Sequence, residues 1–395
     1  MGGPVQLVNG PARGGVVGEL HGFCDQRFEP LEALFRSNQE SGIDEGASLA
    51  ATLGGELVVD LWAGSTDYER TRPWVEDTLV TVFSTSKVMV NIAVLMVYDR
   101  GLLDLDAPIA DYWPEFAQNG KHTITARQIL VHRSGLPGFG RSIGFEEAHD
   151  WDTMIRILEH AEPWYEPGTD AYYHPITYGY LLGEVVRRVS GLGFDDFFRQ
   201  EIAEPLGADF HFGVTSTADQ ARVAQLWYPN PATTPDEADD VVMTEIEQGD
   251  WVVPSRMAAV MPSTSGIGNA RSIARIGAMV AMGGEIDGRR YLSRQTIEEA
   301  GTEQSFQEDR LLGWCRYGLG FGLDSEYFPA STPTSMHWGG FGGSLATMDP
   351  ATGMSVGFAP NRLLVEDTDD GMPMTQERLY TLIRTIGNVS RALTD

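Results

Sequence analysis

An almost continuous apolar stretch runs from residue 88 to residue 97, interrupted only by Asn91. A helix that is hydrophobic on all sides belongs in the interior of a protein. The stretch is followed by Arg100 and Gly101, and a cation in the last turn before a glycine is typical of a helix C-terminus. The pattern therefore predicts a buried helix that begins near Ser84 and ends near Arg100.

Strand patterns occur towards both ends of the chain, and helical patterns lie between them. Residues 47–53 and 56–62 flank Gly54-Gly55, which is typical of a β-hairpin. Further strands are predicted at 317–323, 336–340, 343–348 and 354–359. Helices are predicted at 27–40, 123–132, 151–161, 176–190, 193–202, 273–282 and 375–393. This order predicts one discontinuous sheet domain with a helical insertion.

The composition restricts the partners that we expect. The chain has 395 residues and a formal net charge of −28, whereas binding to nucleic acid or to anionic membranes needs clustered cations. The first ten residues lack the basic region and apolar core of a secretory signal, and no run approaches the length of a membrane span. We expect a cytoplasmic protein that binds a small molecule, and no nucleic acid or membrane. The oligomeric state stays open, a homo-oligomer included.

Three other features of the sequence suggest no chemistry. Cys24 and Cys315 lie outside any C-x-x-C spacing, so we expect buried free thiols and neither a disulfide framework nor a metal site. Residues 1–16 are rich in glycine and are expected to form a flexible arm. Residues 229–250 are a long polar insertion, a length typical of a lid or of a solvated loop. No metal or organic cofactor is expected.

Ser84 and Lys87 are the first candidates for catalysis. Residues three apart on a helix share a face, so Ser84 Oγ and Lys87 Nζ can meet. Serine is a poor nucleophile until a base takes its proton. At the start of a buried helix, desolvation and the helix dipole both favour a neutral lysine, which can act as that base. The alternative is that Ser84 caps the helix and Lys87 lies on the surface, but surface lysines rarely precede ten mostly apolar residues.

Several short motifs follow one another along residues 45–360. They are VDLWAG (59–64), FSTSK (83–87), GLLDLDAP (101–108), YWPEF (112–116), LVHRSGLP (130–137), EPG (166–168), YGYLLG (178–183) and WGGFGGS (338–344). In this order they resemble the serine β-lactamase-like superfamily, most closely its family VIII carboxylesterase branch. Linked motifs are more specific than a single S-x-x-K.

The resemblance implies a fold and a division into domains. The expected fold is α/β (α+β), with a mostly antiparallel sheet flanked by helices, an inserted all-helical domain and a catalytic cleft between the two. Residues 17–82 and 265–395 would form the discontinuous sheet domain. Residues 83–264 would form the helical domain.

The resemblance also implies a catalytic tyrosine, often followed two residues later by asparagine. This chain has no such asparagine, because residues 170–175 read DAYYHP. Tyr173 is the best match by its distance from the following Leu-Leu-Gly, and Tyr172 is the alternative. The tyrosine would relay a proton with Lys87, first from Ser84 and later to the leaving alkoxide. His174 is expected to contact the substrate or to be a polar neighbour of the site.

A third motif sets the expected substrate. Trp338-Gly339-Gly340 stands where β-lactamases and penicillin-binding proteins have Lys-Thr-Gly. The missing cation and the apolar Trp338 favour neutral, hydrophobic acyl substrates, although Trp338 is also a plausible core residue. The two glycines leave room for a substrate beside the strand. The resemblance places the oxyanion hole at the backbone N–H groups of Ser84 and Phe341.

These observations predict a serine hydrolase that cleaves carboxylic esters through an acyl-enzyme on Ser84. An acyltransferase with the same acyl-enzyme is the first alternative. A β-lactamase or D-alanyl peptidase is disfavoured by the missing Lys-Thr-Gly cation, and a non-catalytic binding homologue by the intact Ser84 and Lys87. Residues 342–346 faintly resemble the nucleophile elbow of α/β-hydrolases, but Ser344 is expected to lead into a hairpin and not into a helix.

Overall fold

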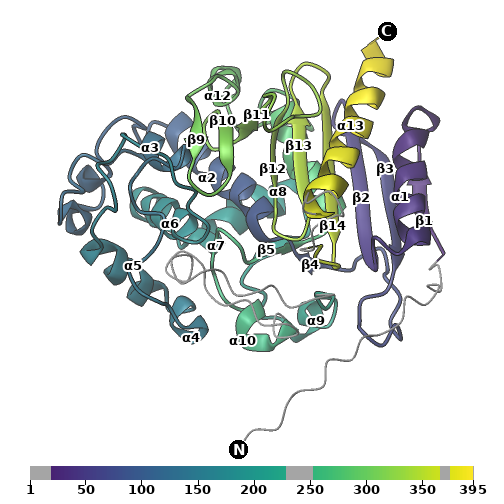
Figure 1. The fold of residues 1–395 in the computed structure, drawn as a ribbon, viewed down its shortest axis with the longest axis horizontal. Helices are drawn as coiled ribbons and strands as arrows, with labels where there is room; N and C mark the ends of the chain where they lie inside the picture. The colour runs from purple at the N-terminus through teal and green to yellow at the C-terminus, as the bar shows by residue number, and fades with distance from the viewer. Residues whose placement is uncertain (1–18, 228–251, 365–373, 395) are drawn as a thin grey trace, which may run out of the picture.

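A nine-stranded sheet forms the centre of the protein (Figure 1). The structure is a computed structural model that describes residues 19–227, 252–364 and 374–394. The strands run in the order β1-β3-β2-β14-β13-β12-β11-β10-β9, and every neighbouring pair is antiparallel. Their bounds are His21–Cys24 (β1), Gly46–Leu53 (β2), Glu56–Gly64 (β3), Ser305–Asp309 (β9), Gly313–Tyr317 (β10), Gly322–Leu323 (β11), Met336–Gly339 (β12), Leu345–Asp349 (β13) and Met354–Pro360 (β14). The predicted mostly antiparallel α/β fold is confirmed.

Strands from the two ends of the chain meet in the middle of this sheet. β14 pairs with β2, with Phe358 opposite Leu49. Helices α1 (Glu29–Ser41) and α13 (Met374–Thr394) cover one face and share a core with the strands. Helix α11 (Ala270–Ala281) packs on the other face. A side chain at Gly357 would meet Ala270 O of this helix at 2.4 Å, so the glycine permits this close packing.

A group of helices lies beside the sheet around α2 (Ser86–Asp99), on the left of Figure 1. They are α3 (Ala126–Leu130), α4 (Phe145–Ala148), α5 (Trp151–His160), α6 (Thr177–Ser190) and α7 (Phe194–Phe198). The other short helices are α8 (Glu204–Leu206), α9 (Thr217–Gln220), α10 (Pro254–Met257) and, at the edge of the sheet, α12 (Arg294–Ala300). Short 3-10 helices occur at Gln26–Phe28, Ile109–Asp111 and Pro114–Ala117, and a π-helix at Arg199–Ala203. Every residue of α2 from Ser86 to Val97 is buried, which confirms the predicted interior helix.

A second, three-stranded sheet joins the helical part to the central sheet. It pairs β4 (Val80–Thr81) with β6 (Gly266–Gly268), and β6 with β5 (Phe210–Phe212), while β7 (Glu285–Ile286) and β8 (Arg289–Arg290) form a separate hairpin. β5 lies inside 83–264, which was expected to be all-helical. This strand forms because Phe210 and Phe212 pack against Phe198.

Some predicted elements differ in the structure. The predicted strand 317–323 is broken by a turn, where Gly320 has a φ of +82° and a side chain would meet Asn91 within 2.5 Å. The predicted helix 123–132 is shorter, because Thr125 caps its start and His132 has a φ of +59°. The arm 1–16 and the insertion 229–250 lie outside the described residues. Within the described ranges, no helix has both the length and the apolar character to span a membrane.

Candidate active site

Ser84 lies in the sharp turn that joins β4 to α2. This turn is a 3-10 helix, η2 (Phe83–Thr85), and Phe83 has a φ of +46°. A bulky residue rarely takes a positive φ, because its Cβ crowds the backbone there, so the turn must be held by its surroundings. The Phe83 ring packs edge-on against Phe341, with ring centroids 5.6 Å apart. Ser84 is thereby held just before the N-terminus of a buried helix, where the dipole favours negative charge.

Lys87 reaches Ser84, as the three-residue spacing predicted. Its Nζ lies 3.0 Å from Ser84 Oγ, 2.8 Å from Pro175 O and 3.4 Å from Ser263 O. The side chain is buried, and burial lowers the pKa of Lys87 well below 10.5. Among the residues that the structure describes, no carboxylate opposes this effect on the pKa. Lys87 is therefore disposed to be a neutral amine that can accept a proton.

Tyr173 contacts both Ser84 and Lys87. Its hydroxyl oxygen accepts a 3.4 Å hydrogen bond from Trp338 Nε1 and interacts with the Ser84 side chain. Its ring centroid lies 4.8 Å from Lys87 Nζ. Burial raises the pKa of Tyr173, so the phenol keeps its proton at neutral pH. Lys87 and Tyr173 are buried and Ser84 is half-buried, so the serine lies beside one neutral base and one neutral acid.

The residues on either side of Tyr173 make other contacts. The Tyr172 ring packs against Trp164, with centroids 5.8 Å apart. His174 is fully buried, with Nε2 2.6 Å from Ser134 Oγ and Nδ1 2.6 Å from Tyr172 O. Burial lowers the pKa of His174 to about 3, so the ring is neutral. His174 is not among the residues that line the cavity described next, and its two hydrogen bonds support the loop that carries Tyr173.

An apolar cavity of about 290 Å³ opens beside Ser84. Ser84 and four other residues predicted for substrate binding or the oxyanion hole line it, namely Trp338, Gly339, Gly340 and Phe341. The rest of the wall is Phe83, Tyr173, Pro175, Ile176, Met261, Thr264, Leu311, Leu312, Phe328 and Leu379. None of these described lining residues has a charged side chain. The cavity therefore suits an uncharged, apolar molecule.

The glycine-rich loop after β12, residues 340–344, is hydrogen-bonded to the turn that carries Ser84. Ser344 Oγ donates to Val82 O at 2.6 Å and lies 2.8 Å from Thr85 Oγ1. A side chain at Gly340 would meet Val82 O at 2.2 Å, so only glycine allows this approach. Ser344 is buried and makes these structural contacts, which agrees with the expectation that it is no nucleophile.

Several residues at the site gave no signal in the sequence. Pro175 and Ser263 contribute backbone carbonyls, which any residue type supplies. Arg378 is buried under the glycine-rich loop, where it donates to Asp44 Oδ1 at 2.6 Å and to Gly342 O. The closing-helix pattern predicts a position for Arg378 on α13 but not its partners, because these lie far away in the sequence.

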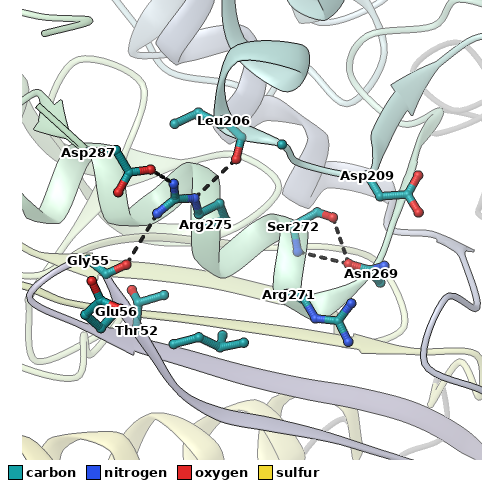
Figure 2. Close-up of a pocket in the computed structure, with 12 residues that line it drawn as sticks. Thr52, Gly55, Glu56, Leu206, Asp209, Asn269, Arg271, Ser272, Arg275 and Asp287 are labelled. Atoms are coloured by element: carbon teal, nitrogen blue, oxygen red, sulfur yellow. Dashed lines mark hydrogen bonds and ion pairs between the residues drawn. The ribbon is translucent and has the colours of Figure 1, made fainter. Parts of the chain in front are cut away.

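A second, polar cleft of about 400 Å³ lies away from Ser84, between α11 and the β2–β3 hairpin (Figure 2). Two arginines of α11 reach into it. Arg275 donates to Leu206 O at 3.2 Å and forms an ion pair with Asp287. Arg271 forms an ion pair of 2.7 Å with Asp60. Both cations are already paired, so the described residues of the cleft offer no unpaired positive charge to a ligand.

Comparison with known proteins agrees with this geometry. The beta-lactamase family model matches residues 31–377. Esterase/beta-lactamase LipL of Mycobacterium tuberculosis is 33% identical over 370 residues, which cover 87% of this chain and 83% of LipL. The crystal structure of a family VIII carboxylesterase has a TM-score of 0.81 and 33% identity, covering 94% of this chain and 100% of that one. A penicillin-binding protein homologue from Caulobacter crescentus has a TM-score of 0.82 and 32% identity, with the same coverage of both chains.

These matches span most of the chain, from the first helix to the last. They confirm the predicted serine β-lactamase-like superfamily and its fold, and the esterases among the relatives support the predicted hydrolase class. The family model covers far more than half of the sequence. The chain belongs to the beta-lactamase family.

Proposed function

We propose that this protein is a serine carboxylesterase that cleaves uncharged esters through an acyl-enzyme on Ser84. One observation carries the proposal. Lys87, whose pKa is lowered by burial, lies 3.0 Å from Ser84 Oγ beside an apolar cavity. A nucleophile paired with a neutral base is the arrangement that acyl transfer needs.

The first half of the reaction forms the acyl-enzyme. Ser84 Oγ attacks the ester carbonyl carbon, and its proton passes to Lys87 Nζ. The carbonyl oxygen becomes an oxyanion that the backbone N–H groups of Ser84 and Phe341 stabilise. When the carbon–oxygen bond to the alcohol breaks, the leaving alkoxide takes a proton from the Tyr173 hydroxyl, which Lys87 reprotonates. Alcohol leaves and the acyl group stays on Ser84.

The second half returns the enzyme to its first state. A water molecule enters in place of the alcohol, and one of its protons passes to Lys87 Nζ as it attacks the acyl carbon. Collapse of the second oxyanion breaks the bond to Ser84 Oγ, which takes a proton back from Lys87 by way of the Tyr173 hydroxyl. The carboxylic acid gives its remaining proton to solvent and leaves as its anion, which the apolar walls do not retain.

The cavity supports the substrate class. Its volume of about 290 Å³ is at the small end of the usual range for ligand pockets, so short esters fit best. The site would also join the two proposed domains. Ser84 and Tyr173 come from residues 83–264, whereas Trp338 and Phe341 come from the sheet domain formed by 17–82 and 265–395.

Parallel assays of an ester and a cephalosporin test this function. Wild type, Ser84→Ala and the exposed control Ser41→Ala are compared on p-nitrophenyl butyrate and on a chromogenic cephalosporin. We expect ester cleavage by wild type and Ser41→Ala, and a loss of about 10⁴-fold or more in Ser84→Ala. Cephalosporin turnover faster than ester turnover would favour a β-lactamase, an activity that the name of LipL includes. Ester cleavage that survives in Ser84→Ala would contradict the proposal.

A further inference from the structure

Two leucines stand at the mouth of the apolar cavity, at the tip of the β9–β10 hairpin. Leu311 and Leu312 line the cavity, yet their exposed fractions are 40% and 42%. They occupy the turn between Asp309, the last residue of β9, and Gly313, the first of β10. Exposed apolar side chains at the rim of a pocket gain by covering a ligand, because its binding removes them from water.

A buried carboxylate fixes this turn. Asp309 is 2% exposed, and its Oδ1 accepts hydrogen bonds from the backbone N–H groups of Leu311 at 2.9 Å and Leu312 at 3.1 Å. The backbone N–H of Tyr173 also interacts with Asp309. The Asp309 carboxylate therefore fixes the leucine turn and lies close to the backbone of Tyr173.

The hairpin and the Tyr173 segment are also joined through their backbones. Ala171 and Asp309 form a parallel bridge, and Arg310 N donates to Ala171 O at 3.1 Å. Arg310 Nε donates to Asp170 Oδ2 at 2.8 Å. The tip of the hairpin is thereby fixed on the Tyr173 side of the cavity.

In the proposed reaction, the Tyr173 hydroxyl protonates the leaving alkoxide, so the alcohol group of the ester must lie on the side of Tyr173. We propose that Leu311 and Leu312 form the binding wall for the alcohol group, and that Asp309 is the positioning residue that holds this wall. The preferred substrates are then esters of apolar alcohols. This inference rests on the proposed function and adds to it a specificity for the alcohol group of the ester.

Two ester series test the wall. The first keeps the acetyl group and changes the alcohol from ethanol to benzyl alcohol, and the second keeps ethanol and changes the acyl group from acetyl to butyryl. In the double variant Leu311→Ala/Leu312→Ala, we expect the ratio of kcat/KM for benzyl acetate to that for ethyl acetate to fall about 10-fold. The butyrate-to-acetate ratio should stay within about twofold. Leu102→Ala, a leucine of 44% exposure elsewhere in the chain, is the control and should change neither ratio.

Two variants of Asp309 test the positioning role. Asp309→Ala removes the acceptor of the turn and should raise KM for benzyl acetate about 10-fold, with a smaller change in KM for ethyl acetate. Asp309→Asn keeps an oxygen acceptor and should restore the preference for benzyl acetate. A merely structural role would lower activity on both esters alike, so equal losses in Asp309→Ala would contradict the positioning role.

A binding measurement separates this inference from the proposed function. In the Ser84→Ala background, the affinities for benzyl acetate and ethyl acetate are measured by tryptophan fluorescence, which needs no turnover. Weaker binding of benzyl acetate on truncation of both leucines supports the wall, whether or not wild type hydrolyses esters. An unchanged affinity ratio, or a shift in the acyl series in place of the alcohol series, would overturn the inference.

Discussion

The chain has two lysines, and both are buried, but their surroundings differ. Lys121 Nζ donates to Glu159 O at 3.1 Å and lies 5.3 Å from the Phe116 ring centroid. Burial lowers the pKa of Lys121 to about 8, and the nearby Glu159 and Glu162 partly oppose this effect. Lys87 lacks such acidic neighbours, and it contacts a serine hydroxyl instead.

The comparison shows that burial alone does not make a lysine a catalyst. Lys121 Nζ donates to a backbone carbonyl at the end of α5, and a carbonyl of this kind is neither a nucleophile nor a proton donor. Lys87 has a nucleophile within reach and a cavity beside that nucleophile. A perturbed pKa points to a functional site when it occurs together with a reactive partner and room for a substrate.

Replacing each lysine by methionine tests this contrast most strongly. Lys87→Met removes the proposed base, and we expect kcat/KM for p-nitrophenyl butyrate to fall about 10³-fold. Lys121→Met should keep kcat/KM within about threefold, because its site lies apart from Ser84. Steady-state kinetics on the two folded variants measure this difference. Equal losses of activity in Lys87→Met and Lys121→Met would show that the two lysines do not differ in catalytic role.

Tyr173 is the second partner that Lys87 has and Lys121 lacks. Tyr173→Phe removes the hydroxyl that interacts with Ser84, and we expect kcat to fall about 10²-fold while KM changes little. Tyr172→Phe is the matched control, because the Tyr172 ring packs against Trp164. If Tyr172→Phe lost more activity than Tyr173→Phe, the proton relay would have to be assigned to Tyr172.

Much of this contrast could be predicted from the sequence, because it depends on local spacing. The buried helix after Ser84 followed from its apolar residues, and the meeting of Ser84 with Lys87 from helical periodicity. Tyr173 was preferred to Tyr172 from its distance along the chain to a motif. Local patterns of this kind fix which side chains share a face or a turn.

The remaining parts of the site depend on contacts between distant segments. Leu311 and Leu312 lie more than 130 residues after Tyr173. No periodic pattern in the sequence indicates that the β9–β10 turn contacts the loop that carries Tyr173. The sequence leaves His174 as a substrate contact or a polar neighbour, because its hydrogen bond to Ser134 joins two loops 40 residues apart. The strand predicted over 317–323 was wrong because Gly320 must approach Asn91 on α2. Such pairings become visible only when the chain is folded.

The pH profile sharpens the comparison of the lysines. The proposed base must be neutral, and burial lowers the pKa of Lys87 well below 10.5. We therefore expect kcat/KM to level off well below pH 10.5, with a rise between pH 7 and pH 9 much smaller than tenfold per pH unit, and to fall at acidic pH as Lys87 becomes protonated. An unshifted lysine would give about a tenfold rise per pH unit across the same range. Such a rise for wild type would show that Lys87 is charged in the free enzyme.

The smallest expected effect is on stability, and its sign follows from linkage. A lysine whose pKa is lower in the folded state binds fewer protons there than in the unfolded state, so stability rises with pH up to 10.5. Between pH 7 and pH 10, Lys87→Met should therefore gain less stability than wild type, because methionine does not titrate. Lys121→Met should reduce this gain by a smaller amount, since the pKa of Lys121 is lowered only to about 8. Denaturant unfolding of the three proteins at both pH values measures these differences. Identical slopes for wild type and Lys87→Met would mean that folding does not shift the pKa of Lys87, and the two lysines would then differ in their partners alone.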